Sequence, residues 1–425
     1  MTPRRLSTLL VVAAVAVAAA AIAGGVSGSA VAGPKATEQA NKSAATLVVR
    51  IWADRNRKAD VEAIAGPWAR RRGLQVQVVE KEFGDIRDGV KTVAAEQAPD
   101  VIVGAHDWVG KLAADGSIVT LRLRQSVTKQ FPKYALDAFS YGRTRSALYG
   151  VPVAVENIGL VVNTRLAAVP KNWADLEKRA LAFKRKGSNR LAIAVQQGAG
   201  GDAYHMYPLF SGLCGYVFGK TRGGALNPND IGLRNPKFLR NAAMIDRWNR
   251  SGLVNAKVDG DAAKAAFLAK RAAYWITGPW NAEDITKAGI NYRVVQVPRI
   301  KCNSVSFLGA QGFMVTRFAR THGVEAAAKD LVGSYLSTAT AQASLSTKNN
   351  RYPANLTAAK RVRNRALSQF GAAGKGGVPM PNIPQMDSVW TDLGAAWVKS
   401  TRGAGATKAR SSFTVAARNI SNKIG

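Results

Sequence analysis

The sequence predicts an α/β protein with two lobes. Its 425 residues exceed what one ordinary core accommodates, and apolar residues make up 47% of them, which is enough to bury more than one core. Strand-like and helix-like segments alternate through the first two thirds of the chain, a pattern typical of sheets flanked by helices. The alternation falls into two blocks, before and after Tyr149. Two lobes therefore fit the pattern better than one.

The first block predicts three strands and two helices, and their order suggests a parallel sheet. Apolar or alternating runs predict strands at residues 47–52, 74–80 and 101–103. Helical spacing covers residues 58–72, ending at Gly73, and residues 85–97.

The second block repeats this rhythm. Strands are expected at residues 151–155, 158–162, 191–195 and 273–276, and helices at 172–186, 203–218, 236–251 and 261–270. Asn172 is a capping candidate at the start of one helix, and Gly187 follows its end. The last third of the chain is expected to be mostly helical.

Residues 1–32 are predicted to be a signal peptide and residues 33–45 a flexible tether. Arg4 and Arg5 precede an apolar run over residues 9–23, and Ala30-Val31-Ala32 suits cleavage after Ala32. An uncleaved membrane anchor is the alternative, because the run approaches spanning length. No cysteine lies near the expected cleavage point, so no lipid anchor is expected. The protein is expected to be secreted or associated with the cell envelope.

The chain is strongly basic, with a formal net charge of +33. Removal of Arg4 and Arg5 with the signal leaves 33 − 2 = +31. This charge predicts attraction to polyanions. The basic residues are scattered without a nucleic-acid motif, so no specific nucleic acid is expected. Loose association with an anionic envelope is one interpretation, and a merely solvated basic surface is the other.

The two cysteines, Cys214 and Cys302, allow one disulfide in an exported protein. Two separate buried thiols are the alternative.

Acidic and aromatic residues follow several predicted strands. Asp54 and Arg55 follow the first strand, Asp107 and Trp108 the third, and Glu156 the first strand of the second block. Trp280 follows the strand at residues 273–276. Ligands bind beyond the carboxyl ends of strands in open α/β sheets. Carboxylates bind sugar hydroxyls and rings cover the C–H faces of sugars, so this pattern favours a carbohydrate site. Asp202, Tyr204 and Tyr207 are further candidates.

A run near the C-terminus strengthens this interpretation. Met380-Pro381-Asn382-Ile383-Pro384-Gln385-Met386 forms a rigid elbow before a helical segment that carries Trp390. The ordered set also includes Ala98-Pro99-Asp100, Pro152-Val153-Ala154-Val155-Glu156, Tyr207-Pro208-Leu209 and Gly278-Pro279-Trp280. From about Leu47 to the C-terminus the chain resembles the maltose/maltodextrin-binding proteins of bacterial ABC importers. These are extracellular solute-binding proteins with the periplasmic binding protein type 2 fold.

The resemblance implies two discontinuous α/β lobes joined by hinge strands, with a sugar cleft between them. The first lobe would comprise residues 46–153 and 307–360, and the second residues 154–306 and 361–425. It implies that the protein acts as a monomer and delivers a maltodextrin-type oligosaccharide to a membrane-embedded ABC permease by hinge closure. Asp54, Asp107 and Glu156 would bind hydroxyls, with Asp202 in place of a Glu and Arg55 in place of a Lys. Tyr204, Trp280 and Trp390 would stack on sugar rings, and Met380 would lie in the site.

Three positions depart from the family's pattern. Gly104 stands where the family has a stacking Trp, Trp108 where it has an Arg, and Gly394 where it has another Arg. Trp108 or Trp52 would have to supply the missing ring. These changes leave the identity of the sugar open.

Two other functions compete with sugar capture. A secreted glycoside hydrolase would need a pair of carboxyl groups with separate acid and base roles, and no pattern marks such a pair. A charge-driven polyanion-binding surface protein is the other alternative. No enzyme activity and no cofactor are therefore expected. No metal site is expected either, because His106, His205 and His322 lie far apart in the sequence and no Cys/His spacing fits a metal site.

Overall fold

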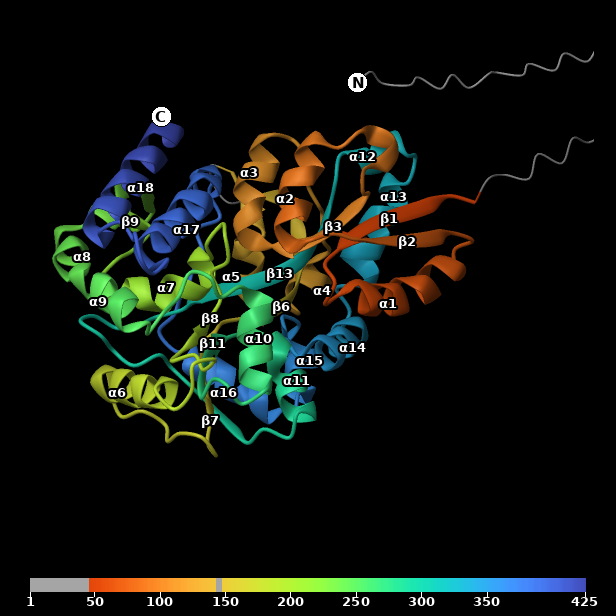
Figure 1. The fold of residues 1–425 in the computed structure, drawn as a ribbon. Helices are drawn as coiled ribbons and strands as arrows, with labels where there is room; N and C mark the ends of the chain where they lie inside the picture. Colours follow the sequence, from red (N-terminus) through yellow and green to blue (C-terminus); the bar gives the residue numbers. More distant parts are fainter. Residues whose placement is uncertain (1–45, 143–146) are drawn as a thin grey trace, which may run out of the picture. The chain divides into compact units, whose positions relative to one another are not determined.

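The computed structural model describes residues 46–142 and 147–425, which contain two mixed β-sheets with helices around them (Figure 1). The signal peptide and tether expected at residues 1–45 lie outside the described residues. None of the helices within the described part combines the length and apolarity that a membrane crossing needs.

The first sheet has the order β14-β6-β13-β3-β1-β2, with β15 beside β13. Its strands are β1 (Val48–Ala53), β2 (Gln75–Glu80), β3 (Val101–Ala105), β6 (Gly150–Glu156), β13 (Phe307–Val315), β14 (Tyr352–Pro353) and β15 (Val378–Pro379). The first three strands are mutually parallel, as predicted, but β13 is antiparallel to both β3 and β6. The expectation of a parallel sheet is therefore wrong beyond β3.

The second sheet has the order β12-β7-β11-β8 and is also mixed. Its strands are β7 (Gly159–Asn163), β8 (Ala194–Val195), β11 (Tyr274–Thr277) and β12 (Tyr292–Val295). Two small hairpins complete the strands: β4 (Ser140–Tyr141) with β5 (Ala147–Leu148), and β9 (Phe218–Lys220) with β10 (Leu226–Ile231).

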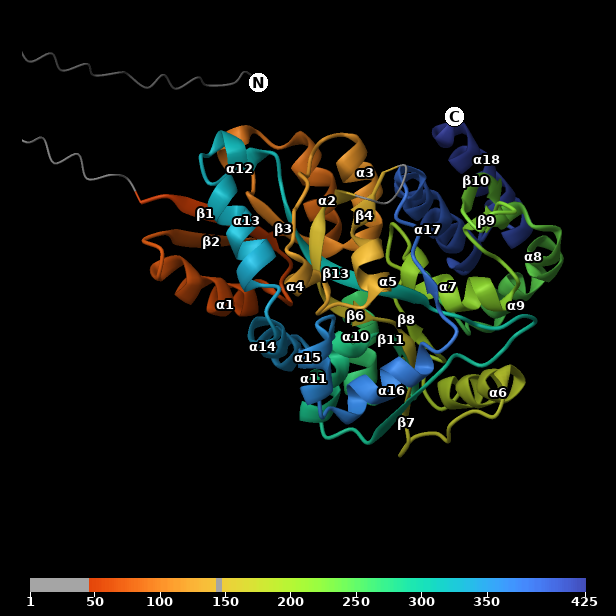
Figure 2. The same ribbon diagram turned by 180° about the vertical axis from the view of Figure 1, so that it is seen from behind.

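Helices surround both sheets. Those of the first part are α1 (Lys58–Arg70), α2 (Phe83–Thr92), α3 (Val109–Ala114), α4 (Gln125–Thr128), α5 (Lys133–Ala138), α12 (Phe318–Thr321), α13 (Glu325–Asp330), α14 (Ala339–Asn349) and α15 (Leu356–Arg361). Those of the second part are α6 (Trp173–Lys184), α7 (Ala203–Gly212), α8 (Pro236–Asn241), α9 (Ala243–Ser251), α10 (Gly260–Leu268), α11 (Ala282–Lys287), α16 (Arg365–Ala373), α17 (Asp387–Thr401) and α18 (Ala409–Ile424). Figure 2 shows α17 and α18 beside α7 and α9, although they are far apart in sequence.

Side-chain alternation along the strands explains the layered core. In β1, Val49 and Ile51 are buried on one face, while Trp52 is buried on the other. Successive strand residues point to opposite faces, so one sheet supports two apolar layers. Asn172 caps α6 by accepting a hydrogen bond from the backbone N–H of Asp175, as its position predicted.

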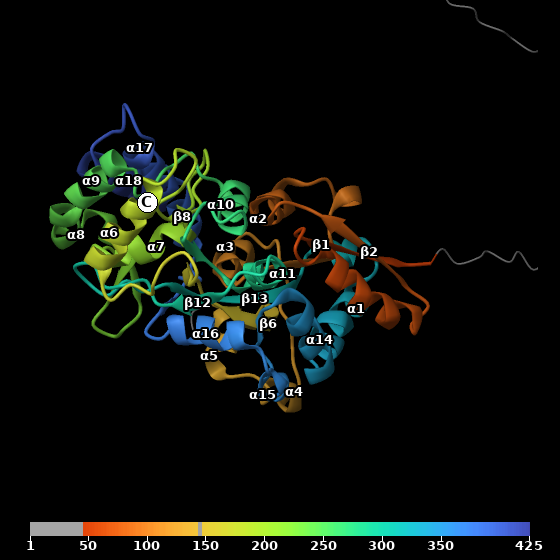
Figure 3. The ribbon, with the colours of Figure 1, turned by 60° about the horizontal axis from the view of Figure 1, so that its bottom comes forward.

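The chain passes from the first sheet to the second between β6 and β7, after Glu156, and returns between β12 and β13. After α15 it enters α16, which packs against β12 and β7 of the second sheet, and then β15 pairs with β13 in the first sheet. Figure 3 shows β6 and β13 next to each other, where they are paired. The two-lobe α/β fold expected from the sequence is present, while the exact lobe boundaries at residues 153, 306 and 360 stay a prediction.

Two differences from the expected elements affect the segments around the site. The helix expected at residues 203–218 ends at Gly212, because Cys214 adopts a left-handed backbone conformation with φ +73°. The strand β13 was missed in a region expected to be mostly helical. Its glycines, Gly309 and Gly312, weaken the strand signal of this otherwise apolar segment.

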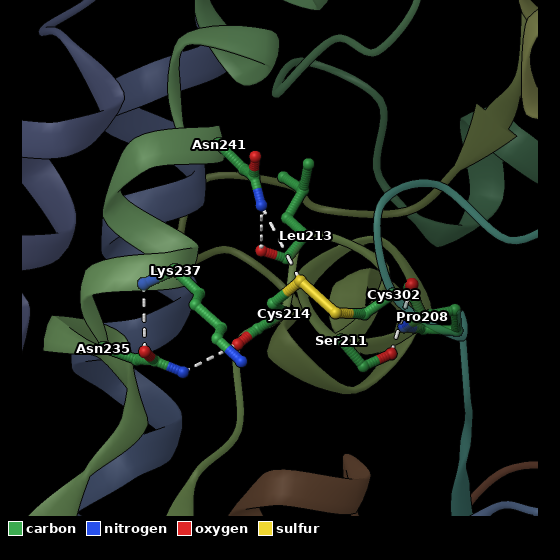
Figure 4. The surroundings of a disulfide bond; sticks show 8 residues. All are labelled: Pro208, Ser211, Leu213, Cys214, Asn235, Lys237, Asn241 and Cys302. Atoms are coloured by element: carbon green, nitrogen blue, oxygen red, sulfur yellow. Dashed lines mark hydrogen bonds between the residues drawn. A yellow bond between two sulfur atoms is a disulfide. The ribbon is translucent and has the colours of Figure 1, made fainter.

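A disulfide joins Cys214, just after α7, to Cys302 in the connection that leads into β13 (Figure 4). The backbone N–H groups of Lys301 and Cys302 both donate to the carbonyl of Gly212 at 2.9 Å. Asn235 donates to the carbonyl of Cys214 at 3.1 Å. The end of α7 is thereby attached to the segment that enters the central strand.

Replacing both cysteines by Ala should lower the free energy of unfolding by about 2–4 kcal/mol, because the unfolded chain regains the freedom of a loop spanning 88 residues. Denaturant unfolding with and without reductant measures this. Reductant should destabilise the wild-type protein and leave the double variant unchanged. Equal behaviour of the wild-type protein in both conditions would contradict the disulfide.

Candidate functional site

A cleft of about 740 Å³ is lined by residues from both parts of the fold. All ten ligand-binding candidates from the sequence lie on it: Asp54, Arg55, Asp107, Trp108, Glu156, Asp202, Tyr204, Trp280, Met380 and Trp390. They come from separate stretches of the chain, so tertiary folding brings them together. Their roles in binding stay predictions.

Aromatic rings form one wall of the cleft. The ring centroids of Tyr204 and Trp280 are 6.5 Å apart, and those of Trp390 and Phe307 are 5.9 Å apart. Phe307 also stacks on Tyr204 with a centroid distance of 6.2 Å. Tyr204, Trp280 and Trp390 are only partly buried, so they offer ring surface to a ligand.

A buried ionic network also lines the cleft, and its member Arg351 lies over the Trp280 ring, 5.6 Å from the ring centroid. Arg57 donates hydrogen bonds to Asp54 and, at 2.8 Å, to Oε1 of Gln311. Gln311 donates to Glu156 at 2.8 Å, and Arg351 donates to the other oxygen of Glu156 at 2.6 Å. Burial opposes ionisation of Asp54, but the neighbouring charges of Arg57 and Arg351 and the hydrogen bonds that it accepts outweigh burial and lower its pKa. Both Asp54 and Glu156 are therefore held by arginines.

The sequence analysis missed Arg57, Gln311 and Arg351. Gln311 lies on the unrecognised strand β13, and Arg351 directly precedes β14. Arg57 lies three residues after the predicted ligand residue Asp54. This short spacing between a basic residue and a candidate carboxylate was the available signal.

Asp107 differs from these carboxylates. Its Oδ2 accepts a hydrogen bond from Nε1 of Trp390 at 3.0 Å, while its Oδ1 is buried and unbonded within residues 46–142 and 147–425. Burial raises the pKa of Asp107 to about 6. Its free oxygen can accept a hydrogen bond from a ligand.

Asp202 is largely occupied within the protein. It caps α7 by accepting from the backbone N–H of His205 at 2.8 Å. Its other oxygen accepts from Gln196 at 2.6 Å and from Nδ1 of His205 at 2.8 Å. The geometry gives Asp202 a structural role that the sequence analysis did not anticipate.

Trp108 occupies the space beside Gly104. A Cβ atom at position 104 would collide with the Trp108 ring, so a large side chain at 104 and this position of Trp108 exclude each other. Both indoles are buried, Trp108 with 4% and Trp52 with 3% exposure, but Trp108 lines the cleft, whereas Trp52 lies next to Gly89 and does not. Trp108 is thus the better candidate for the replacement ring.

Gly394 lies against a backbone rather than at an open position. A Cβ atom at Gly201, where φ is +78°, would collide with the backbone of Gly394. Helix α17 and the loop before Asp202 approach this closely because both residues lack a side chain. An arginine at position 394 would therefore not fit without moving this loop.

Two further features lie outside the buried site. Arg55 forms an exposed ion pair of 3.6 Å with Asp261 of α10, across the cleft, and exposed pairs contribute little to stability.

A larger groove of about 1290 Å³ is lined by mostly exposed residues of α11, β12 and α16. It contains none of the ten candidates, so the smaller cleft is the better candidate site.

Asp107→Asn should stabilise the sugar-free protein at pH 7. A carboxyl whose pKa is about 6 when folded and 3.8 when unfolded lowers the free energy of unfolding as pH rises between these values. At 1.36 kcal/mol per pKa unit this cost is at most about 3 kcal/mol. The variant should match the wild-type protein at pH 4 and exceed it at pH 7 in urea unfolding. Identical pH profiles would show that Asp107 carries no such cost.

Comparison with known proteins identifies the family. Residues 63–369 match the family of bacterial extracellular solute-binding proteins. The galactooligosaccharide-binding protein of Bacillus subtilis (strain 168) is 27% identical over 86% of this chain and 87% of its own. The maltodextrin-binding protein MdxE of the same strain is 27% identical over 88% of this chain and 91% of its own.

A solved structure supports the fold. The maltotriose-binding protein of Thermus thermophilus, bound with maltotriose, has a TM-score of 0.78 and 23% identity, and the match covers 89% of this chain and 100% of that chain. This similarity confirms the two-lobe α/β fold. The family match covers well over half of the sequence and agrees with the resemblance carried by the ordered motifs. The chain belongs to the bacterial extracellular solute-binding proteins.

Proposed function

We propose that this protein captures an uncharged oligosaccharide of the maltodextrin type in the cleft between its lobes. The observation that carries the proposal is a set of buried polar atoms that lack partners within the described chain, next to partly exposed rings. The atoms are Asp107 Oδ1, the Tyr204 hydroxyl and His205 Nε2, and all three residues line the cleft with Trp280 and Trp390.

A sugar can bind both to the unpartnered polar atoms and to the partly exposed rings. Unpaired buried polar atoms cost free energy, and a sugar hydroxyl both donates and accepts hydrogen bonds. The flat C–H faces of a sugar cover aromatic rings. The cleft's volume of about 740 Å³ lies in the usual range for small-ligand sites. The names of the relatives, which bind galactooligosaccharides and maltodextrin, support the same ligand class.

The charges of the cleft favour a neutral ligand. Asp54 and Glu156 are bonded to Arg57 and Arg351, so their charges are already compensated. A charged ligand would have to displace these partners, whereas a neutral sugar leaves them in place.

Hydrolysis has less support. Glycosidases use a proton-donating carboxyl group and a second free carboxylate. Among Asp54, Asp107, Glu156 and Asp202, only Asp107 has an oxygen without a partner in residues 46–142 and 147–425. We therefore propose binding without chemistry, as in the solute-binding relatives.

The bound sugar would be delivered by hinge closure. The two connections between the sheets, after β6 and before β13, and the connection from α15 to α16 are where a change in backbone angles would move one lobe against the other. We propose that the closed protein, acting as a monomer, presents the sugar to a membrane-embedded ABC permease. The names of the Streptococcus pneumoniae relatives, which are solute-binding lipoproteins of a maltooligosaccharide ABC transporter, support this partner class.

Trp280→Ala and Trp390→Ala should each weaken maltotriose binding about 5- to 150-fold, because a lost stacking ring costs about 1–3 kcal/mol. Calorimetric titration with maltotriose, a galactotriose and a cyclodextrin measures the affinities. Without sugar, the melting temperature should fall less in Trp280→Ala than in Trp390→Ala, because the second change also removes the hydrogen-bond donor to Asp107.

Tyr134→Ala is the matched control, since Tyr134 is 61% exposed and lies outside the cleft. It should bind as the wild-type protein does. Failure of the wild-type protein to bind any of these sugars would contradict the proposed function.

We also propose that the net charge, which is +33 for the full chain and 33 − 2 = +31 without Arg4 and Arg5 of the signal, holds the protein loosely at an anionic cell envelope after export. Screening weakens such attraction, since the Debye length falls from about 10 Å at 0.1 M salt to about 3 Å at 1 M. Washing intact cells with 1 M sodium chloride should release additional protein, which immunoblotting detects. Equal release in low and high salt would contradict this association.

A further inference from the structure

The first turn of α7 orients an imidazole toward the cleft. Asp202 accepts hydrogen bonds from both the backbone N–H and the Nδ1–H of His205, each at 2.8 Å. Gln196 donates to the same carboxylate at 2.6 Å. Because the carboxylate holds Nδ1, the other ring nitrogen, Nε2, is left for a further partner.

The ring of His205 is fixed by its neighbours as well. It packs edge-on against Trp280 with a centroid distance of 5.8 Å and an interplanar angle of 84°. Tyr204 lies 5.4 Å away at 76°. The residue is only 6% exposed and still lines the cleft. Its position is therefore set before a ligand arrives.

Nε2 of His205 is buried and has no hydrogen-bond partner in the described part of the chain. The hydroxyl oxygen of the preceding residue, Tyr204, is also buried and has no hydrogen-bond partner among the described residues. The Nε2 atom of a neutral imidazole would accept a hydrogen bond, and the Nε2–H of a protonated one would donate a hydrogen bond. A sugar hydroxyl is a suitable partner in either state, whereas a C–H group is not.

We propose that His205 is a specificity-determining residue that recognises one hydroxyl of the sugar ring stacked on Trp280. Asp202 is the positioning residue that directs Nε2 to this hydroxyl. The proposal rests on the sugar-binding function proposed above. In this proposal the hydrogen bond to that sugar hydroxyl is made by His205, and not by Asp202 or Tyr204.

The test compares the wild-type protein with His205→Phe and His205→Gln, using maltotriose and a series of its monodeoxy derivatives. Phe keeps a ring of similar size but has no nitrogen, so maltotriose affinity should fall about tenfold, equivalent to about 1.4 kcal/mol. Gln carries an amide at about the distance of Nε2 and should restore part of the affinity. One deoxy derivative should bind wild-type protein about tenfold more weakly than maltotriose, and the Phe variant should no longer distinguish the two.

Asp202→Ser separates positioning from helix capping. Ser is a good N-cap residue and keeps the bond to the backbone of α7, but it lacks the second oxygen that holds Nδ1. Its melting temperature without sugar should stay close to wild type, while the discrimination between maltotriose and the deoxy derivative should shrink. Unchanged discrimination in this variant would overturn the positioning role of Asp202.

The outcomes distinguish the two proposals. If wild-type protein binds maltotriose and His205→Phe binds it with the same affinity and selectivity, the role of His205 is overturned and the sugar-binding function stands. If all derivatives lose affinity equally in His205→Phe, the residue only supports packing, and the inference is also overturned. If wild-type protein binds none of the sugars, the function itself fails.

Discussion

A buried ionic network connects the parts of the fold that form the site. Asp54 follows β1, Arg57 precedes α1, Glu156 ends β6, and Gln311 lies in the central strand β13. Arg351 closes the network from the segment before β14. Leaving any one of these charges without its partner would place an uncompensated charge in a dry environment, which is strongly unfavourable. The network therefore forms only when the strands of the first sheet are in their native order and the side chains of these five residues lie in their native positions.

This constraint divides the polar groups of the cleft into two kinds. Asp54 and Glu156 are already satisfied by arginines, so they shape the wall and keep it nearly neutral. Asp107, Tyr204 and His205 each keep one buried atom without a partner inside the described residues. A ligand gains most from groups whose hydrogen bonds are missing before it binds. Of the carboxylates predicted from the sequence, only Asp107 is thus among the groups that would gain a missing hydrogen bond from a ligand.

The central strand explains why the sequence was only partly informative. Strands β1 and β3 were predicted because short, apolar runs are bounded by clear breaks, and α6 because Asn172 is a strong cap. β13 pairs antiparallel with β3 and β6, more than 150 residues away along the chain, and no local pattern encodes that partner choice. Gln311 was missed with it. The end of α7 was placed too late because Cys214 adopts a left-handed conformation that its residue type does not suggest.

The sequence by itself determined the class of fold, the family and ten of the side chains that line the cleft, since alternation, caps and ordered motifs can be recognised along the chain. The tertiary structure alone decided which of these side chains lack hydrogen-bond partners. Glu156 is paired with Arg351, which lies 195 residues away along the chain. Asp202 and His205 are close in sequence, as are Gly104 and Trp108, but the side-chain orientations that bond the first pair and pack the second depend on the folded backbone. Hydrogen bonds and steric exclusion act over a few ångströms, so only the packed chain determines them.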